Sequence, residues 1–485
     1  MHYLFSLLGL LVILQFTSCK KDQLLTSSDA KLSFSQDSVL FDTVFVQTGS
    51  TTRYFRVSNP NSQRIKISSL KLARGNSSFY RLNVDGVPGK SFNDIEIPAH
   101  DSIYVFVEVT VDPNNISNPF IYQDSVVFET NGTVQDVDLV CFARNAYFHY
   151  PQHFIPFKNG SSFGYSLSSV VQKDSVWNND KPHVIYGYVV IDSTFSLTIN
   201  AGTEVYIHQN GGIWVYRYGA IKVMGTATSP VLFQQDRLDP EYKDIAGQWD
   251  RIWIHQGSNK NEINYAVIKN SFIGIQASYS GLDGFYASLS DPKKLKLYNT
   301  KIQNCSGIGI LTRYFNVEAG NCVISNCKEQ LVALQYGGSY SFRHCTIANY
   351  WTHASRSTPS VFINNYTEAE TIPIDSAYFV NCIIDGTNAD ELQIDSAADA
   401  NSFKHVLFDH CLVKTQLNTG ASPYLFKNVL QNASASFVNP GLYDFKLNAN
   451  SAAIDLGTNL PNYPLDIDGQ SRIGLPDIGA YEYKP

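Results

Sequence analysis

The chain of 485 residues carries little charge, since Asp, Glu, Lys and Arg together make up only 16% of it. Its 36 basic and 43 acidic side chains give a formal charge of −7, and no stretch is strongly basic. Nucleic-acid binding requires a positive surface, so that class of partner is excluded. Low charge together with 29 Tyr and 29 Phe is typical of extracytoplasmic proteins built from β-strands.

The sequence also lacks cysteine pairs with the spacing of a metal site. No Cys-x-x-Cys pair occurs, and Cys322 with Cys327 forms the only close pair. Because this pair has no second half, zinc binding is a poor explanation. A disulfide framework is equally poor, since Cys141 stands alone in the first half of the mature chain.

The apolar stretch at the start of the chain is too short to cross a bilayer. It runs for eleven residues from Leu4 to Leu14, with two small residues inside it. This length suits the apolar region of a signal peptide, although the usual Lys or Arg before it is missing. We therefore expect residues 1–18 to be a leader and residues 19–30, which are polar and rich in Ser, to form a tether.

A four-residue pattern returns through the second half of the chain: an aromatic residue or Ile, any residue, Asn or His, then Cys. Five copies have Cys and a sixth has Ser in its place. The copies end at Ser271, Cys305, Cys327, Cys345, Cys382 and Cys411. Their spacings are 34, 22, 18, 37 and 29 residues, of which we expect the two shortest to be one structural repeat each. Short runs of alternating apolar residues lie between the copies, which predicts stacked strands and turns, that is, a parallel β-helix.

Stacking explains why the pattern needs an amide followed by a small residue. Equivalent positions of successive turns lie about 4.8 Å apart, so an Asn can bond to the Asn of the next turn while Cys faces the core. The copy that ends in Ser271 favours packing over metal coordination, because a hydroxyl fills the same space but is a poor zinc ligand.

The mature chain is too long for a single core and is expected to form two domains. Removing the leader leaves 485 − 18 = 467 residues. Residues 31–146 contain seven or eight short strand candidates between turn signals, which predicts an Ig-like β-sandwich. We expect residues 147–185 to be a linker and N-terminal cap, residues 186–420 the single-stranded parallel β-helix, and residues 421–485 its last turns and C-terminal cap.

The sequence Phe16-Thr17-Ser18-Cys19 resembles the lipobox of bacterial lipoproteins. This resemblance implies cleavage before Cys19, lipid attachment to it, and anchoring to the outer membrane of the cell envelope. Lys20-Lys21-Asp22-Gln23 is similar to tracts behind the Cys of lipoproteins displayed on the cell surface. It can equally be a solvated part of the tether.

The second part of the chain, about residues 185–485, resembles right-handed parallel β-helix lipoproteins of Gram-negative bacteria. The resemblance is carried by Ser196–Thr203, Gly219–Thr226 and Gly247–Ile254, and by the ending Asp477–Tyr483. Within the first domain, Val57-Ser58-Asn59-Pro60 is similar to part of the Ig-like modules that precede bacterial surface repeats. Together they imply an all-β chain in which an Ig-like β-sandwich is followed by a right-handed β-helix.

The catalytic signatures of well-known β-helix enzymes are absent. Polygalacturonase-type hydrolysis needs clustered Asp residues and a Gly-His-Gly, and that tripeptide does not occur. Pectate lyases need a calcium site with an Arg base on neighbouring turns of the β-helix, and no matching motif is found. The only Arg-Ile-Lys, Arg64-Ile65-Lys66, lies in the first domain, outside the predicted β-helix. The fold alone is therefore a weak argument for enzyme activity.

One acidic cluster between strand candidates could bind a hard cation. Its carboxylates are close enough in sequence to converge on calcium, although they could instead keep a solvated insertion soluble. The candidate calcium ligands are Asp236, Asp239, Glu241, Asp244 and Asp250. No cofactor is required by anything else in the sequence.

Aromatic side chains near the loops are candidates for stacking on sugar rings, although most aromatic residues in strands belong to the core. The candidates are Trp214, Tyr216, Tyr218, Trp249 and Trp253. The insert from Tyr279 to Lys294 contains Gly281, Gly284 and Pro292, and is expected to line a binding face.

Three functions remain open at this stage. The favoured one is a noncatalytic surface lipoprotein whose β-helix binds glycans or other polymers. The second is a polysaccharide lyase or glycoside hydrolase with an unrecognised site, which would need two titratable groups in one groove. The third is a structural protein of the envelope. The missing catalytic motifs favour the first over the second.

Overall fold

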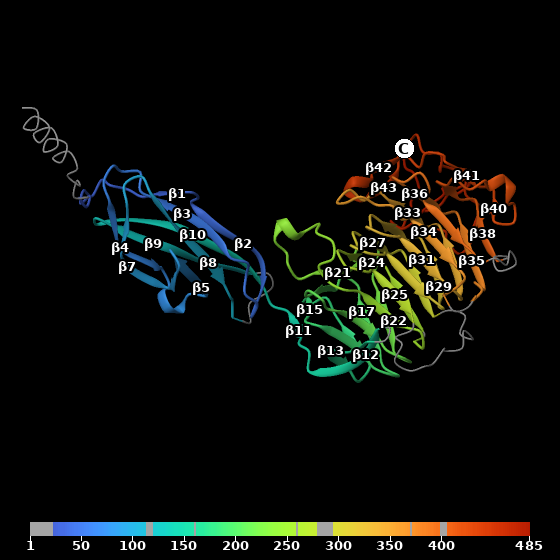
Figure 1. The fold of residues 1–485 in the computed structure, drawn as a ribbon, viewed down its shortest axis with the longest axis horizontal. Helices are drawn as coiled ribbons and strands as arrows, with labels where there is room; N and C mark the ends of the chain where they lie inside the picture. The colour runs from blue at the N-terminus through green and yellow to red at the C-terminus, as the bar shows by residue number, and fades with distance from the viewer. Residues whose placement is uncertain are drawn as a thin grey trace, which may run out of the picture. The chain divides into compact units, whose positions relative to one another are not determined.

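The structure is a computed structural model that describes residues 23–112, 120–159, 162–258, 260–278, 294–368, 371–397 and 405–485. It divides into two compact units, residues 1–145 and 146–485, and both are built from β-strands (Figure 1). The prediction of an all-β chain is therefore confirmed. Within the described ranges, no helix has the length and apolar character needed to cross a membrane. Cys19 and the leader lie outside the described residues.

The first unit is a sandwich of two five-stranded sheets. One sheet has the order β1 (Ser33–Phe34), β3 (Arg53–Ser58), β8 (Ser102–Val109), β5 (Tyr80–Val84), β6 (Val87–Gly89). The other has the order β2 (Ser38–Phe45), β10 (Thr133–Arg144), β9 (Phe120–Thr130), β4 (Ile65–Leu72), β7 (Ser91–Ile97). All neighbours are antiparallel except β2 and β10. Alternate side chains such as Phe55 and Val57 of β3 are fully buried between the sheets.

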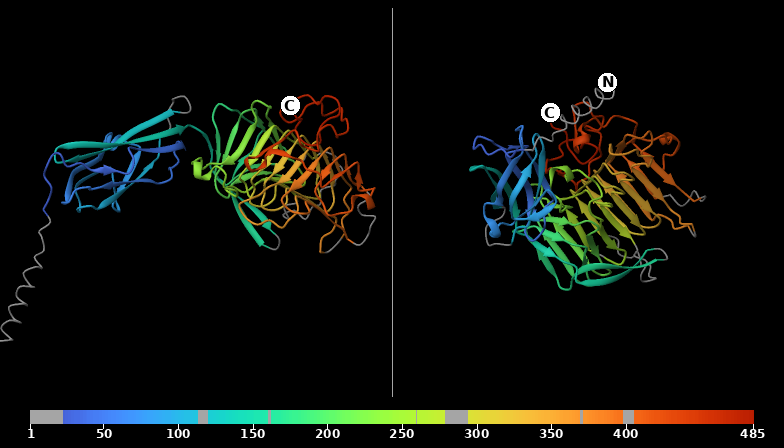
Figure 2. Two further views of the ribbon diagram at one scale, coloured as in Figure 1. Left: turned by 90° about the horizontal axis from the view of Figure 1, so that it is seen from above. Right: turned by 60° about the vertical axis from the view of Figure 1, so that its left-hand side comes forward.

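The second unit is a coil of stacked turns with three long sheets, and its strands lie side by side in Figure 2. We call them sheets 1, 2 and 3. Sheet 1 is β11 (Tyr147–His149), β15 (His183–Ile185), β18 (Glu204–Ile207), β21 (Val231–Gln235), β24 (Ala266–Lys269), β27 (Lys301–Gln303), β30 (Val323–Ser325), β33 (Thr346–Asn349), β36 (Ile383–Gly386), β39 (Leu412–Val413), β41 (Leu430–Gln431). Sheet 2 is β12 (His153–Asn159), β13 (Ser162–Val171), β16 (Tyr188–Ile191), β19 (Gly212–Val215), β22 (Ile252–His255), β25 (Ile275–Ser278), β28 (Ile310–Arg313), β31 (Val332–Gln335), β34 (Val361–Asn364), β37 (Leu392–Asp395). Sheet 3 is β14 (Ser175–Trp177), β17 (Ser196–Asn200), β20 (Ala220–Met224), β23 (Asn261–Asn264), β26 (Leu295–Tyr298), β29 (Asn316–Gly320), β32 (Ser339–Arg343), β35 (Ser376–Val380), β38 (Val406–Asp409), β40 (Phe426–Lys427).

Successive turns of the coil pass through one strand of each sheet, except that the last turn, from β39 to β41, has no strand in sheet 2 among its described residues. The stacked strands are parallel, apart from the antiparallel pair β12 and β13. Inward side chains therefore stack on their equivalents in the next turn. Phe342, Phe379, Phe408 and Phe426 form such a column, with ring centroids 4.8, 4.8 and 5.4 Å apart. The parallel β-helix predicted from the repeated pattern is confirmed.

The repeated pattern occupies two different corners of the coil. The copies ending at Ser271, Cys305 and Cys327 follow strands of sheet 1, whereas those ending at Cys345 and Cys382 follow strands of sheet 3. The copy ending at Cys411 also follows a strand of sheet 3, β38. The 18-residue spacing between Cys327 and Cys345 is therefore a change of corner, and our expectation that it was one turn was wrong. One turn in this region takes 22 or 23 residues, as in the pairing of Val323 with residues 301 and 346.

Both corners use the same local chemistry. The third residue of the pattern has a positive φ, for example 57° at Asn304 and 49° at His344. Asn and His tolerate this left-handed conformation better than branched residues do. Their side chains then bond between turns: the Nδ2 of Asn304 donates to Oδ1 of Asn270 at 2.7 Å, and the Nδ2 of Asn381 lies 2.9 Å from Nε2 of His344.

The cysteines of the described residues are free and buried. Ser271 Oγ lies 3.3 Å from Cys305 Sγ, so the hydroxyl takes the place of a thiol in the same column. Burial raises the pKa of the Cys327 and Cys382 thiols, which keeps them protonated and unreactive. The packing role predicted for these residues agrees with this arrangement.

The tail after β41 folds back over the outer face of sheet 1 (Figure 1). It contains β42 (Phe437–Asn439), the 3-10 turn η5 (Pro440–Leu442) and β43 (Asp444–Leu447). Phe445, Ile478 and Ala480 are fully buried in one cluster with Ile383 and Leu412 of the sheet. The tail is therefore more than a cap for the last turn, because it covers a lateral face and forms walls for the grooves described below.

Candidate functional site

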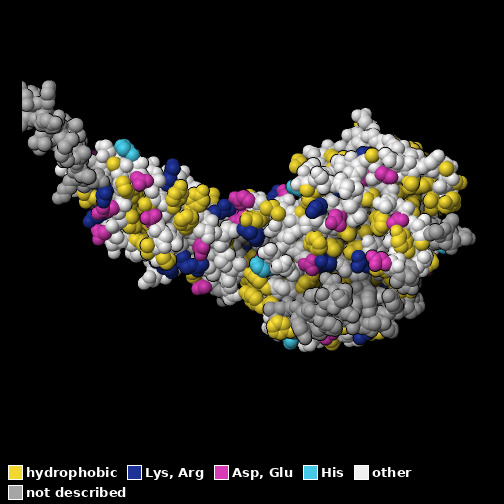
Figure 3. All heavy atoms as spheres, in the orientation of Figure 1, with side chains coloured by type: hydrophobic (Ala, Val, Ile, Leu, Met, Phe, Trp, Pro, Cys, Tyr) yellow, Lys and Arg dark blue, Asp and Glu magenta, His cyan; other side chains and the backbone are white. Residues whose placement is uncertain are grey.

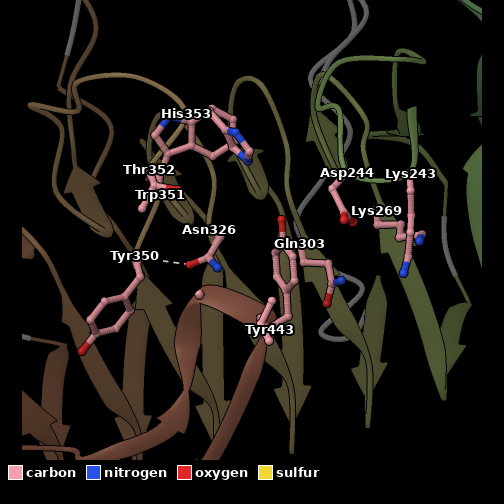
Figure 4. A pocket seen from close by; sticks show the side chains of 12 residues that line it. Lys243, Asp244, Lys269, Gln303, Asn326, Tyr350, Trp351, Thr352, His353 and Tyr443 are labelled. Atoms are coloured by element: carbon pink, nitrogen blue, oxygen red, sulfur yellow. Dashed lines mark hydrogen bonds between the residues drawn. The ribbon is translucent and has the colours of Figure 1, made fainter. Parts of the chain in front are cut away.

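A groove of about 510 Å³ crosses the outer face of sheet 1 (Figure 4). We call it the sheet-1 groove. Figure 4 shows Lys243, Asp244 and Lys269 on one side, and Trp351 with His353 on the other. The wall on the first side is the loop between β21 and β22, which contains the 3-10 turn η2 (Pro240–Tyr242). Tail residues 441–443 complete the lining.

The floor of the groove is formed by outward-facing positions of adjacent strands. Ile268 and Ile302 are fully buried in the core, so the next residues, Lys269 of β24 and Gln303 of β27, point outward. These two residues are register partners in neighbouring strands. They occupy the variable second position of the repeated pattern, so the pattern that fixes the corner also places two polar side chains in the groove.

The far wall is the loop after β33, and a buried ion pair holds it in place. Arg356 donates from NH2 to Glu391 Oε1 at 2.5 Å and from NH1 to Oε2 at 2.9 Å. The two side chains are 2% and 0% exposed. Glu391 also accepts from the Ser360 hydroxyl at 2.7 Å. The loop that carries Trp351 and His353 is therefore fixed by a buried charge pair, and Arg356 also donates to the Asn349 carbonyl at 3.2 Å.

One buried donor of the groove lining has no hydrogen-bond partner in the described part of the chain. Trp351 is 8% exposed, and its Nε1 is buried without a hydrogen-bond partner among the described residues. Asn326, in contrast, is satisfied: its Oδ1 accepts from the Tyr350 amide at 2.9 Å and its Nδ2 donates to the Pro440 carbonyl at 2.9 Å. A buried indole N–H without a partner costs free energy.

Burial lowers the pKa of Lys269, and the nearby charge of Lys243 lowers it further, while Asp244 acts in the opposite direction. An ammonium group in this position is incompletely compensated, because the groove lining supplies two lysines and one carboxylate. His353 also lines the groove and is exposed. The groove is therefore locally cationic in a chain whose net charge is −7.

A second groove, of about 450 Å³, lies at the corner between sheets 3 and 1. Asn264, Asn299 and Asn321 form a ladder along it, with Nδ2 to Oδ1 distances of 2.9 and 3.1 Å. Tyr298 and Tyr463 of the tail also line it, with ring centroids 6.5 Å apart. Amides and phenol rings dominate this lining, whereas the sheet-1 groove is marked by its lysines and Trp351.

The five carboxylates predicted as calcium ligands are not brought together. Asp236 accepts a hydrogen bond from His208 at 2.7 Å, which raises the pKa of that histidine. Asp250 bonds to Tyr188 and, at 2.8 Å, to Arg251. The remaining three are Asp239 before η2, Glu241 within it, and Asp244 in the sheet-1 groove. Across the described ranges, no three His, Cys, Asp or Glu side chains gather into a possible metal site. Calcium binding stays a prediction that this geometry does not support.

Two of the aromatic residues predicted to stack on sugars are unsuited to it. Trp214 and Trp249 are each 1% exposed. The first stacks on Trp253 at 5.0 Å, and the second donates from Nε1 to the Lys269 carbonyl at 2.8 Å. Trp253 and Tyr216 are partly exposed, while Tyr218 is 52% exposed. Local sequence could not separate these cases, because outward-facing side chains of a sheet can still be covered by other parts of the chain. Residues 279–293 of the predicted binding insert lie outside the described residues.

Comparisons with known proteins do not place the chain in a family. No family model matches it, and no curated protein matches it.

Charged side chains on the face shown in Figure 3 are scattered, which agrees with the composition.

Solved structures match it only weakly. A family 123 glycoside hydrolase from Clostridium perfringens matches at 10% identity and a TM-score of 0.17, covering 23% of this chain and 25% of its own. A Porphyromonas gingivalis protein of unknown function has 12% identity and a TM-score of 0.19, covering 30% and 60%. A PapD-like domain of human CEP192 has 13% identity and a TM-score of 0.17, covering 27% and 96%. Likenesses at this level carry no argument about activity.

Proposed function

We propose that the protein is a lipid-anchored β-helix protein of the cell envelope that binds a glycan in the sheet-1 groove without cleaving it. The observation that supports this most is the polar floor of the groove, where Lys269 and Gln303 point outward from adjacent strands. Sugars offer many hydroxyl acceptors and donors, and amide and aromatic side chains on fixed strands suit them without further reorganisation.

The groove is less suited to hydrolysis. Glycoside hydrolases ordinarily use two carboxyl groups that flank the bond to be cleaved. Among the described lining residues of the groove, Asp244 is the one carboxylate. A lyase is the second candidate, because Lys269, with its lowered pKa, shares the groove with Asp244 and could act as a base.

Binding to a panel of neutral and acidic oligosaccharides, measured by calorimetry on the purified chain, tests the proposal. Gln303→Ala removes an amide from the groove floor, and we expect about three- to tenfold weaker binding, the loss typical of one neutral hydrogen bond. Gln393→Ala is the matched control, because Gln393 is an exposed outward-facing residue of β37.

The same samples are assayed for new reducing ends and for unsaturated products. Binding without product, weakened by Gln303→Ala and unchanged by Gln393→Ala, supports the proposal. Product formation that is lost in Asp244→Asn would establish the lyase or hydrolase instead. If no oligosaccharide of the panel binds, the proposed glycan binding is wrong and a structural role in the envelope is the remaining function.

The proposed anchor is the lipid on Cys19, which lies outside the described residues. Replacing Cys19 with Ala is expected to move the protein from the membrane fraction to the soluble fraction, because lipidation requires the thiol. Ser18→Ala keeps the thiol and is the matched control. Membrane association that persists in Cys19→Ala would rule out this anchor.

A further inference from the structure

The sheet-1 groove, which carries the proposed function, has the chemistry of a site for an anion. Lys243 and Lys269 both line it, and neither ammonium forms a hydrogen bond or ion pair with a described residue. Lys269 is partly buried at the end of β24. A partly buried ammonium without a partner is unfavourable, so a negative group of the ligand would compensate it.

The polar groups of the groove strengthen this reading. The ammonium groups of Lys243 and Lys269 are donors only. The acceptor of Asn326 is already occupied by the Tyr350 amide. A ligand that is rich in acceptors and carries negative charge matches these donors, whereas a neutral polyol would leave the ammonium groups incompletely compensated.

We propose that the sheet-1 groove selects acidic sugars, with Lys243 and Lys269 binding a carboxylate or sulfate. The proposal rests on the glycan-binding function and specifies its ligand class. Asp244 lies on the same side of the groove as both lysines, so it compensates one of their two positive charges and leaves one for the ligand.

Calorimetric titration of the full chain with three hexasaccharides tests this selectivity: galacturonate, a sulfated galactan fragment, and neutral cellohexaose. We expect at least about tenfold tighter binding of an acidic sugar than of the neutral one, since hydrogen bonds to charged groups are the stronger class. Lys269→Met should remove most of this difference. Lys222→Met, an exposed lysine on β20 of sheet 3, should not.

Thermal unfolding followed by tryptophan fluorescence checks that each variant folds. Binding of the acidic sugar should also weaken as salt is raised, and less so in Lys269→Met. Equal binding of neutral and acidic sugars, or acidic binding unchanged in Lys269→Met, would overturn the anionic selectivity while leaving glycan binding intact. Absence of binding to all three would overturn both. Comparison of galacturonate with the sulfated sugar decides which anion is held.

Discussion

Replacing Arg356 with Met is expected to lower the free energy of unfolding of the β-helix by about 3–5 kcal/mol. The carboxylate of Glu391 is fully buried, so removing the guanidinium leaves an uncompensated charge in a low-dielectric interior. The Arg356 NH1 also donates to the Thr358 carbonyl at 2.6 Å, and that bond is lost with it. All five tryptophans lie in the β-helix unit, so their fluorescence in a urea titration reports this unit alone.

Two further variants separate charge from packing. In Arg356→Met with Glu391→Gln, the neutral amide can still accept from Ser360, so the double variant should recover part of the loss. Lys446→Met breaks an exposed pair with Asp468, whose side chains are 55% and 36% exposed. It should cost less than about 1 kcal/mol. A loss in Arg356→Met no larger than that of Lys446→Met would show that the buried pair contributes little.

Acidification should destabilise the β-helix well before its carboxylates are protonated. Burial lowers the pKa of His344 to about 3, with Arg472 acting in the same direction, and burial lowers the pKa of His183 to about 4. In the unfolded chain both groups titrate near 6.5, so between pH 6.5 and pH 4 the unfolded state binds more protons. Stability is therefore complete above pH 6.5 and falls as pH decreases, by up to about 1.4 kcal/mol per pH unit for each histidine.

His344→Asn provides the matched comparison. Asn already occupies the equivalent corner position at Asn321 and Asn381, with the same positive φ. The variant should keep the ladder and lose only the titration, so its unfolding midpoint in urea should fall less between pH 7 and pH 4.5. His149 lies in the first turns of the coil, with its Nε2 2.9 Å from His183 Nδ1. Burial lowers its pKa as well, so it adds to the loss of stability at low pH. Identical pH profiles for the variant and the parent chain would contradict the assignment to His344.

The sequence could predict the β-helix because its signals are local and repeated. Alternating apolar residues make each strand, and an Asn or His followed by a small residue makes each corner. The sequence could not distinguish the two corners, since Asn304 and His344 need the same left-handed conformation wherever the coil turns. The step from Cys327 to Cys345 therefore looks like a short repeat, although it joins two columns.

The functional groove depends on parts of the chain that are distant in sequence. Lys269 and Gln303 could have been recognised as outward-facing from the repeated pattern. Lys269 and Gln303 share the groove with Trp351 and Tyr443 only because a loop is held by Arg356 and the tail returns across sheet 1. No local periodicity encodes such a return. The burial of Trp214 was missed for a similar reason, because exposure depends on what covers a strand.

The tail has a consequence for how the coil can change in length. It is tied to three successive turns of the coil: Pro440 accepts from Asn326, Ala480 donates to Thr346, and Thr458 exchanges two hydrogen bonds with Asn381. A duplicated turn would fit the corners and core columns without strain, yet it would move these attachment points apart by one strand spacing. The hydrogen bonds of the tail therefore fix the number of turns in this part of the coil, although the repeated pattern by itself would allow turns to be added.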